Sequence, residues 1–319
     1  MIDTRVEGER GTSVMQRGRV GRGGRIGYGA GALAVLLAAS GCSGGPEPAG
    51  PRAVPVKPVA ATSPAATPDA SATPATPATP AQDAVPDAAW AKWGVAPLPK
   101  APAPPTDRPI KLTGTGPVPV FSEVPTTDKV VFITIDDGAE KDPQFVEMLT
   151  ELKVPITMFL TDDIVKNDYA YFKPLQALGN SIQNHTVSHP VMSKLPADRQ
   201  KSQICDDQAA LTEQYGTAPY LFRPPYGDGA DSAALNAAVQ ECGPRAVVLW
   251  RESMQIHDMQ YQAADKKLRN GDIILAHFRG PSELKGETMT RMFAELLSRI
   301  QEQGFAVARL DDYVAAPTG

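Results

Sequence analysis

The sequence predicts that residues 110–319 fold as an α/β domain around a parallel sheet. Seven short apolar runs alternate with longer stretches of helical character, which is typical of strand–helix–strand units. Gly179, Gly216 and Gly304 stand where helices should end, as helix C-terminal caps commonly do. An open doubly wound sheet and a barrel both fit this alternation.

The predicted elements follow one another from residue 129 onward. The strand signals are KVVFITI, PITMFLT, NSIQN, YLFR, RAVVLW, DIILAHF and FAVARL. The stretches of helical character between them are PQFVEMLTELK, DYAYFKPLQALG, ADRQKSQICDDQAALTEQYG, DSAALNAAVQECG, YQAADKKLRNG and TMTRMFAELLSRIQEQG. In the first of these, the spacing of Phe145, Met148 and Leu152 places three apolar side chains on one face. That spacing indicates an amphipathic helix packed on the sheet.

Residues 1–42 have the pattern of an export signal. A basic segment, RGRVGRGGR, precedes an apolar segment, GAGALAVLLAASG, that is too short to span a membrane. Cys42 follows at once, and LLAASGC resembles a bacterial lipoprotein signal, in which this cysteine becomes the lipidated first residue. We therefore expect an extracytoplasmic protein anchored to the bacterial cell membrane through Cys42. An ordinary secretory signal, which would give a secreted protein, is the alternative.

Residues 43–109 have the composition of a disordered linker. This segment is rich in Pro, Ala and Thr and holds more than half of the chain's 31 prolines. Such a composition buries too little apolar surface to offset the conformational entropy of ordering the chain. We therefore expect an extended tether here and assign the folded domain to residues 110–319.

The charge and the cysteine content of the chain indicate which partners to expect and whether a disulfide forms. The net charge is −5 and no basic stripe stands out, so nucleic acid is not expected as a partner. With Cys42 assigned to lipidation, Cys205 and Cys242 remain, and two such cysteines outside the cytoplasm tend to form a disulfide. Two unpaired buried thiols are the alternative. We expect a monomer.

Two polar motifs at strand ends indicate a metal site. In HTVSH, His185 and His189 are four residues apart, a spacing that lets two imidazoles bind one metal ion. Pro190 disfavours a regular helix at His189, so this pair is expected on an irregular turn. One of Asp136 and Asp137, at the end of KVVFITI, would complete a catalytic zinc set, and the other would act as a base on the metal-bound water. Solvated acids that cap the next helix are the alternative.

Three further strand ends carry candidate functional side chains. Arg223 precedes a rigid Pro-Pro, which suits the orientation of a carboxylate and of a backbone N–H toward an oxyanion. His277 ends DIILAHF, where it would protonate a leaving group. Trp250 ends RAVVLW as an aromatic wall. The alternatives are a proline-rich turn for the first and core side chains for the other two.

The ordered motifs TIDDG, HTVSH, RPPYG and LAH resemble those of the polysaccharide deacetylase family, which is carbohydrate esterase family 4 with its NodB homology domain. The resemblance implies an irregular (β/α)7-type barrel. It also implies a metal-dependent hydrolase that acts on carbon–nitrogen bonds other than peptide bonds and deacetylates N-acetylated sugar polymers such as peptidoglycan or chitin-like glycans. The metal would be zinc, or cobalt or another transition metal. An esterase for O-acetylated xylan or sugars, and an inactive cell-wall-binding homologue, are the alternatives.

The resemblance also implies the roles of individual residues around the metal. Asp136 would be the general base, and Arg223 would hold its carboxylate in place. Asp137, His185 and His189 would be the metal ligands.

The same resemblance implies the roles of the residues that would bind the oxyanion, the leaving group and the substrate. The backbone N–H of Tyr226 would stabilise the oxyanion, and His277 would be the general acid that protonates the departing amine. Leu275, Trp250 and Pro224 would contact the substrate.

One motif departs from the family pattern. Members usually carry an Asp-Trp pair after the strand that ends here at Trp250, and its Asp tunes the acid histidine. This chain has WRESMQIHDMQ, so Asp258, followed by Met259, or Glu252 would have to support His277. The departure predicts a weaker acid and an altered sugar subsite, and it is the sole support for the inactive alternative.

Overall fold

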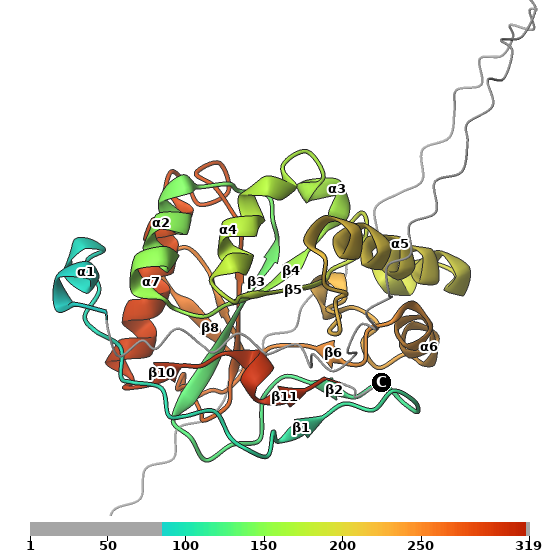
Figure 1. Cartoon of the computed structure of the whole chain (residues 1–319), viewed down its shortest axis with the longest axis horizontal. Helices are drawn as coiled ribbons and strands as arrows, with labels where there is room; N and C mark the ends of the chain where they lie inside the picture. The colour runs from blue at the N-terminus through green and yellow to red at the C-terminus, as the bar shows by residue number, and fades with distance from the viewer. Residues whose placement is uncertain (1–84, 317–319) are drawn as a thin grey trace, which may run out of the picture. The chain divides into compact units, whose positions relative to one another are not determined.

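The structure is a computed structural model that describes residues 85–316. These residues form a mixed α/β fold in which helices lie outside a largely parallel sheet (Figure 1). No helix in this part of the chain is both long and apolar enough to cross a membrane. The α/β class that the sequence predicts is confirmed.

The elements are short apart from β3, α5 and α7. The strands are β1 Ile110–Lys111, β2 Val120–Phe121, β3 Val130–Asp137, β4 Thr157–Leu160, β5 Ser181–Asn184, β6 Val247–Val248, β7 Glu252–Met254, β8 Met259–Tyr261, β9 Ile273–His277, β10 Ala306–Val307 and β11 Val314–Ala315. The α-helices are α1 Asp87–Lys92, α2 Pro143–Leu152, α3 Asp162–Val165, α4 Phe172–Ala177, α5 Ala197–Tyr215, α6 Ala233–Cys242 and α7 Met289–Glu302. The 3-10 turns are η2 Tyr169–Tyr171, η3 Met192–Lys194, η4 Pro225–Gly227 and η5 Leu310–Asp312.

The main sheet has the strand order β5-β4-β3-β9-β7-β8, and β10 pairs with the start of β3. All of these pairs are parallel except β7 with β8, which form an antiparallel hairpin. Beyond β5, Phe222 forms parallel bridges with Asn184 and with Val247, and β6 pairs in parallel with β2. The parallel pairing therefore extends past β5 in the way that a barrel requires, while closure into the predicted seven-stranded barrel stays a prediction.

Strand β3 lies in the middle of the sheet, and both of its faces are covered. Every residue from Val130 to Asp136 is buried, as expected for a parallel strand covered on both sides. It pairs with β4 on one side and β9 on the other, in a register that sets Asp136 opposite His277. The carboxyl ends of these strands therefore bring polar side chains to one edge of the sheet.

The predicted amphipathic helix is confirmed as α2. Its N-cap, Asp142, accepts a hydrogen bond from the backbone N–H of Gln144 at 2.9 Å, which satisfies one free donor of the first turn. Phe145 is fully buried and meets Phe278 and Phe293 edge to face, with ring centroids 5.8 and 5.1 Å apart. Burial of one such phenylalanine contributes about 2–3 kcal/mol to folding, so this face anchors α2 to the sheet.

The folded part begins earlier than the sequence predicts. Residues 85–109, expected in the disordered linker, include α1, whose Trp90 is 4% exposed and lies in the core. Next to it, Trp93 donates a hydrogen bond to Glu151 on α2 at 2.8 Å, and Lys92 pairs with the same carboxylate at 2.6 Å. The average composition hides these few apolar anchors among the prolines. The predicted signal segment, Cys42 and the linker up to residue 84 lie outside the described residues.

The expected disulfide is present. Cys205 on α5 and Cys242 at the end of α6 are joined, with their Cα atoms 4.7 Å apart. The two helices are also in contact with each other (Figure 1). Since α5 follows the HTVSH segment in the chain, this cross-link fixes a helix close to the candidate metal ligands.

Candidate active site

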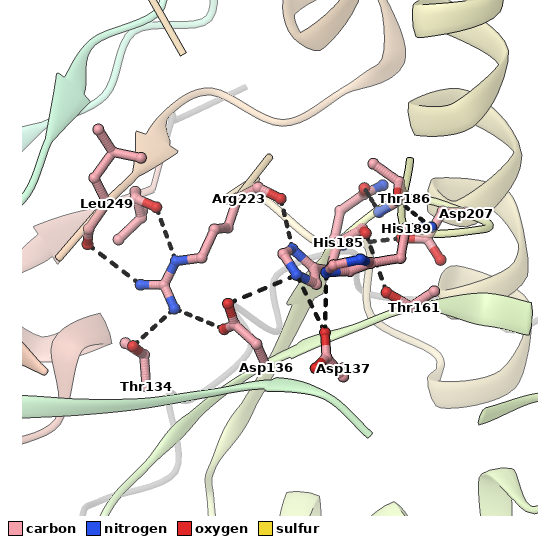
Figure 2. Close-up of polar contacts among 12 residues, drawn as sticks. Thr134, Asp136, Asp137, Thr161, His185, Thr186, His189, Asp207, Arg223 and Leu249 are labelled. Carbon is pink, nitrogen blue, oxygen red and sulfur yellow. Dashed lines mark hydrogen bonds and ion pairs between the residues drawn. The ribbon is translucent and has the colours of Figure 1, made fainter. Parts of the chain in front are cut away.

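The polar side chains that end β3, β5 and the Phe222 bridge meet at one edge of the sheet. Figure 2 shows Arg223, Asp136, His185 and Asp137 in a row, with His189 behind His185. The sequence separates these residues widely, and the parallel pairing of their strands brings them together. All five belong to the set that the sequence predicts.

Three of these residues form a cluster that could hold a metal ion. The ligand atoms of Asp137, His185 and His189 all lie within 4.8 Å of one another. Asp137 Oδ1 is 3.5 Å from His185 Nε2 and 3.2 Å from His189 Nε2. The same oxygen is buried and accepts no hydrogen bond. A buried, unsatisfied carboxylate oxygen beside two imidazole nitrogens calls for a cation at this point.

The tautomer of His185 strengthens this reading. Its Nδ1 lies 2.7 Å from the carbonyl oxygen of Arg223, and because a carbonyl only accepts, Nδ1 carries the hydrogen. A neutral ring then directs the lone pair of Nε2 toward Asp137, which is the orientation of a metal-bound histidine held by a backbone carbonyl. Two nitrogens and one carboxylate oxygen match the donor set of catalytic zinc sites.

The pKa values of His185 and Asp137 also indicate that the surroundings of the cluster favour an ionised carboxylate next to a positive charge. Burial alone would lower the pKa of His185, but the carboxylates of Asp136 and Asp137 outweigh it and raise that pKa. Burial alone would raise the pKa of Asp137, but the contacts with His185 and His189 outweigh it and hold that pKa well below its usual value. The surroundings therefore favour a carboxylate that is ionised and matched by a cation.

Strained backbone surrounds the cluster. Among the described residues other than glycine, seven have a positive φ, and four of these lie at this site: Asp137 at 73°, Thr186 at 75°, His189 at 54° and Tyr226 at 61°. Each such conformation costs on the order of 1 kcal/mol or more and persists only where neighbouring contacts hold it. Their concentration here is typical of a functional site, and the sequence gives no signal of it.

Asp136 is bound by a fully buried arginine. Arg223 Nη1 donates to Asp136 Oδ1 at 2.6 Å and to the hydroxyl of Thr134 at 2.8 Å. Its Nε donates to the carbonyl of Val248 at 2.9 Å, and its guanidinium lies 4.2 Å from the centre of the Phe159 ring. Arg223 is 0% and Asp136 2% exposed, so the pair is shielded from water. Thr134, which the sequence analysis missed, stands out only as a polar residue within an apolar strand.

His277 lies beside Asp136 in the sheet but lacks an acidic partner. Burial lowers the pKa of His277 to about 4, against the attraction of Asp136 and Asp137, and the charge of Arg279 lowers it further. No carboxylate of the described residues forms an ion pair with its ring.

The two predicted supports of His277 are placed elsewhere. Asp258 sits in the turn of the β7–β8 hairpin, 87% exposed, and pairs with Arg299 on α7 at 3.2 Å, so its assignment to His277 is wrong. Glu252 is buried beside Asp272, and burial together with that second carboxylate raises its pKa. The hairpin accounts for Asp258, because this residue lies in the exposed turn between β7 and β8 and contacts α7. Met259, which follows Asp258, is buried in the core.

Tyr226, the predicted oxyanion residue, and the three predicted substrate contacts are divided between the surface and the core. Tyr226 is 67% exposed, with its ring centre 4.8 Å from that of His189. Trp250 is half-buried, 5.6 Å from the Arg223 guanidinium. Pro224 is buried and precedes η4, and Leu275 on β9 is 5% exposed. Tyr226 and Trp250 therefore lie at the site, the first beside a candidate metal ligand and the second beside Arg223.

Comparison with known proteins agrees with this arrangement. A family model described as polysaccharide deacetylase matches residues 123–247. A peptidoglycan-N-acetylglucosamine deacetylase of Bacillus cereus is 28% identical over 192 residues, which cover 57% of this chain and 87% of that protein. A carbohydrate esterase family 4 pseudoenzyme from Bacillus anthracis has the same fold, with a TM-score of 0.51 and 19% identity over 62% of this chain and 69% of that one.

A longer match comes from an uncharacterised protein of Streptomyces coelicolor. It is 38% identical over 197 residues, which cover 61% of this chain and 77% of that protein. Together with the family match across the TIDDG, HTVSH and RPPYG motifs, this similarity places the chain in the polysaccharide deacetylase family.

Proposed function

We propose that this protein is a metal-dependent hydrolase that removes acetyl groups from N-acetylated sugar polymers, with peptidoglycan as its substrate. The observation that carries the proposal is the convergence of Asp137, His185 and His189 beside the buried pair of Asp136 and Arg223. The first three residues suit the binding of a metal cation, and the pair of Asp136 and Arg223 keeps an ionised carboxylate next to that cation. A hydrolase that activates water needs both the cation and a neighbouring base.

Each side chain has a defined task in this reaction. Asp137, His185 and His189 would hold the metal, zinc in the first instance or cobalt, which when bound supplies a Lewis acid and lowers the pKa of water. Asp136 accepts the proton of the attacking water, and Arg223 keeps its carboxylate oriented through the 2.6 Å hydrogen bond.

The other side of the site completes the transfer. The backbone N–H of Tyr226 stabilises the oxyanion that forms at the acetyl carbonyl, and His277 donates a proton to the departing amine. Trp250, which is half-buried, would contact the substrate, whereas Leu275 and Pro224 are buried. The products are acetate and an amino sugar.

The substrate class and the location support each other. The relative from Bacillus cereus is a peptidoglycan deacetylase, and peptidoglycan lies outside the bacterial membrane. A lipid anchor at Cys42 and a Pro-rich tether would place the domain there. The disulfide between Cys205 and Cys242 supports an oxidising compartment.

The surroundings of His277 favour a second candidate, the hydrolysis of O-acetyl esters such as those of xylan. A histidine whose pKa is about 4 is a scarce proton donor at neutral pH. An alcohol leaves more readily than an amine and needs less help from an acid. The pair of Asp136 and Arg223 and the metal cluster argue against the third reading, an inactive wall-binding homologue.

An acetate-release assay tests the proposal. The chain without its predicted signal segment (residues 43–319) is stripped with a chelator, reloaded with zinc or cobalt, and supplied with N-acetylglucosamine oligomers, peptidoglycan or O-acetylated xylan. We expect metal-dependent acetate release, and a loss of about 10²–10⁴-fold in Asp136→Asn. Asp163→Asn, an exposed acid paired with Lys166, serves as the control and should retain full activity. Release from xylan alone would establish the ester reading, and no release by the metal-loaded protein would contradict the enzyme reading.

A further inference from the structure

The loop that carries His185 and His189 is bound from behind by one short segment of α5. The backbone N–H of Val187 donates to the carbonyl of Gln203 at 3.0 Å. The N–H of Ser188 donates to the side-chain oxygen of Gln203 at 2.9 Å. These bonds hold the part of the loop that lies between the two histidines.

The start of the same loop is held one turn further along α5. The side-chain amide of Asn184 donates to the carbonyl of Ile204 at 2.9 Å and to the side-chain oxygen of Gln208 at 3.2 Å. Residues 203–208 thus provide a row of acceptors that matches the donors of residues 184–188.

Asp207 is the acidic member of this row. Its side chain is 0% exposed, and its Oδ2 accepts the backbone N–H of His185 at 3.1 Å. The same N–H also donates to the carbonyl of Leu160 at 3.1 Å, so Asp207 and the end of β4 hold it together. Its Oδ1 accepts the backbone N–H of Asp162, the first residue after β4 and Thr161, also at 3.1 Å. Figure 2 shows Asp207 behind His185, on the side away from Asp136. One carboxylate therefore ties the chain that follows β4 to the first histidine of HTVSH.

Packing alone does not explain this carboxylate. Among the described residues no lysine or arginine pairs with Asp207, and burial raises the pKa of its carboxyl group, so an ionised side chain is costly here. The backbone N–H groups of His185 and Asp162 offset part of that cost. The neighbouring Thr186 and His189 have positive φ values of 75° and 54°, which persist only if the surroundings enforce them.

The anchoring segment is itself immobilised. Cys205 lies within it, between Gln203 and Asp207, and is joined to Cys242 on α6. The imidazole of His185 is then fixed from two sides, because Asp207 holds its backbone and the carbonyl of Arg223 holds its Nδ1.

We infer that Asp207 is a positioning residue for the metal centre, acting through the backbone of His185, with Gln203 as its partner on the same segment. The inference rests on the metal centre of the proposed function. Outer residues that orient a ligand change metal affinity about 10- to 100-fold when they are replaced.

The test compares two adjacent aspartates. In Asp207→Asn one oxygen becomes an amide that faces a backbone N–H, donor against donor, so the two acceptor contacts cannot both persist. Asp206→Asn is the matched control, because Asp206 is exposed on the same helix. The zinc dissociation constant is measured in residues 43–319 by competition with a chromophoric chelator. The visible absorption spectrum of the cobalt form reports the ligand geometry.

We expect zinc binding about 10- to 100-fold weaker and an altered cobalt spectrum in Asp207→Asn, with both unchanged in Asp206→Asn. A folded Asp207→Asn protein that binds zinc within about twofold of the unaltered protein, with the same cobalt spectrum, would overturn the inference and leave the proposed function intact. If the unaltered protein binds no metal, the proposed function itself fails.

A second pair of variants decides the question if Asp207→Asn does not fold. Gln203→Ala removes the acceptor for Ser188, whereas Gln203→Glu keeps an oxygen in the same place. We expect weaker zinc binding in Gln203→Ala and recovery in Gln203→Glu. Equal affinity in both variants and in the unaltered protein would overturn the inference.

Discussion

Replacing Arg223 with methionine should destabilise the protein far more than an ordinary loss of a salt bridge. Arg223 is fully buried and donates to Asp136, Thr134 and the carbonyls of Val248 and Leu249. Methionine fills part of the same space without a charge or donors. The change therefore removes the hydrogen-bonded cation of a buried carboxylate and leaves only the imidazole of His185, 3.6 Å away, beside it.

The size of the effect follows from the geometry of the pair. At the observed 2.6 Å, two unit charges attract by about 6 kcal/mol with an effective dielectric constant of about 20. Desolvation of both groups offsets most of this attraction while the pair is intact. Removal of one member leaves the desolvation of the other uncompensated, and the typical net cost is about 3–5 kcal/mol. That is a large share of the roughly 5–15 kcal/mol by which domains are stable.

Urea unfolding of the metal-free protein measures this cost. Tryptophan fluorescence gives the free energy of unfolding by linear extrapolation, and Trp250 lies 5.6 Å from the altered side chain. Arg291→Met is the control, because Arg291 is exposed and pairs with Glu295 one turn away, so its loss should cost less than about 1 kcal/mol.

A double-mutant cycle with Asp136→Asn isolates the pair itself. If the charges compensate each other, the double variant should be less destabilised than the sum of the single variants, by about 1.5–3 kcal/mol. The reasoning is refuted if the two effects simply add, or if Arg223→Met costs no more than Arg291→Met.

Two further predictions concern stability away from the site. Replacing Cys205 and Cys242 with serine removes a cross-link between residues 37 apart in the chain. We expect the free energy of unfolding, measured in urea, to fall by about 2–4 kcal/mol. A fall of less than about 1 kcal/mol would contradict this expectation. Burial and the neighbouring Asp272 raise the pKa of Glu252, so the folded protein keeps a proton that the unfolded chain loses above its ordinary pKa of 4.5. Stability should therefore decline as pH rises above about 4.5, and Glu252→Gln should flatten that decline in urea unfolding at several pH values; an unchanged slope would show that Glu252 is not responsible.

The residues that end apolar strands could be predicted from the sequence, and they are the ones that the structure brings together. Asp136 and Asp137 end an apolar run that indicates a buried strand, and His185 follows the shorter predicted strand NSIQN. Parallel strands place their carboxyl ends at one edge of the sheet. Which aspartate faces the histidines and which faces Arg223 was implied only by the family resemblance. In the structure it is Asp137 that approaches both imidazoles and Asp136 that approaches the guanidinium.

Features that depend on tertiary packing could not be predicted from the sequence. Asp207 lies in a polar helical stretch beside Asp206, and only the position of α5 against the HTVSH loop buries one and exposes the other. Asp258 was matched to His277 by its place in the chain, but two three-residue strands form a hairpin around it. Strands that short give no reliable periodicity. The burial of Trp90 could not be predicted either, because a single apolar side chain barely changes the average composition of a proline-rich segment.

Three buried or largely buried carboxylates lie around His185, and each is stabilised in a different way. Asp136 has Arg223, a cation that the chain supplies and encloses. Asp207 has backbone N–H groups, which fix the loop. Asp137 has an oxygen without a hydrogen bond and two imidazoles that direct nitrogen atoms toward it. The first two carboxylates are satisfied by the fold itself, so the need for an external cation falls on Asp137 alone. This difference is the structural basis on which we propose Asp137, His185 and His189 as the metal ligands.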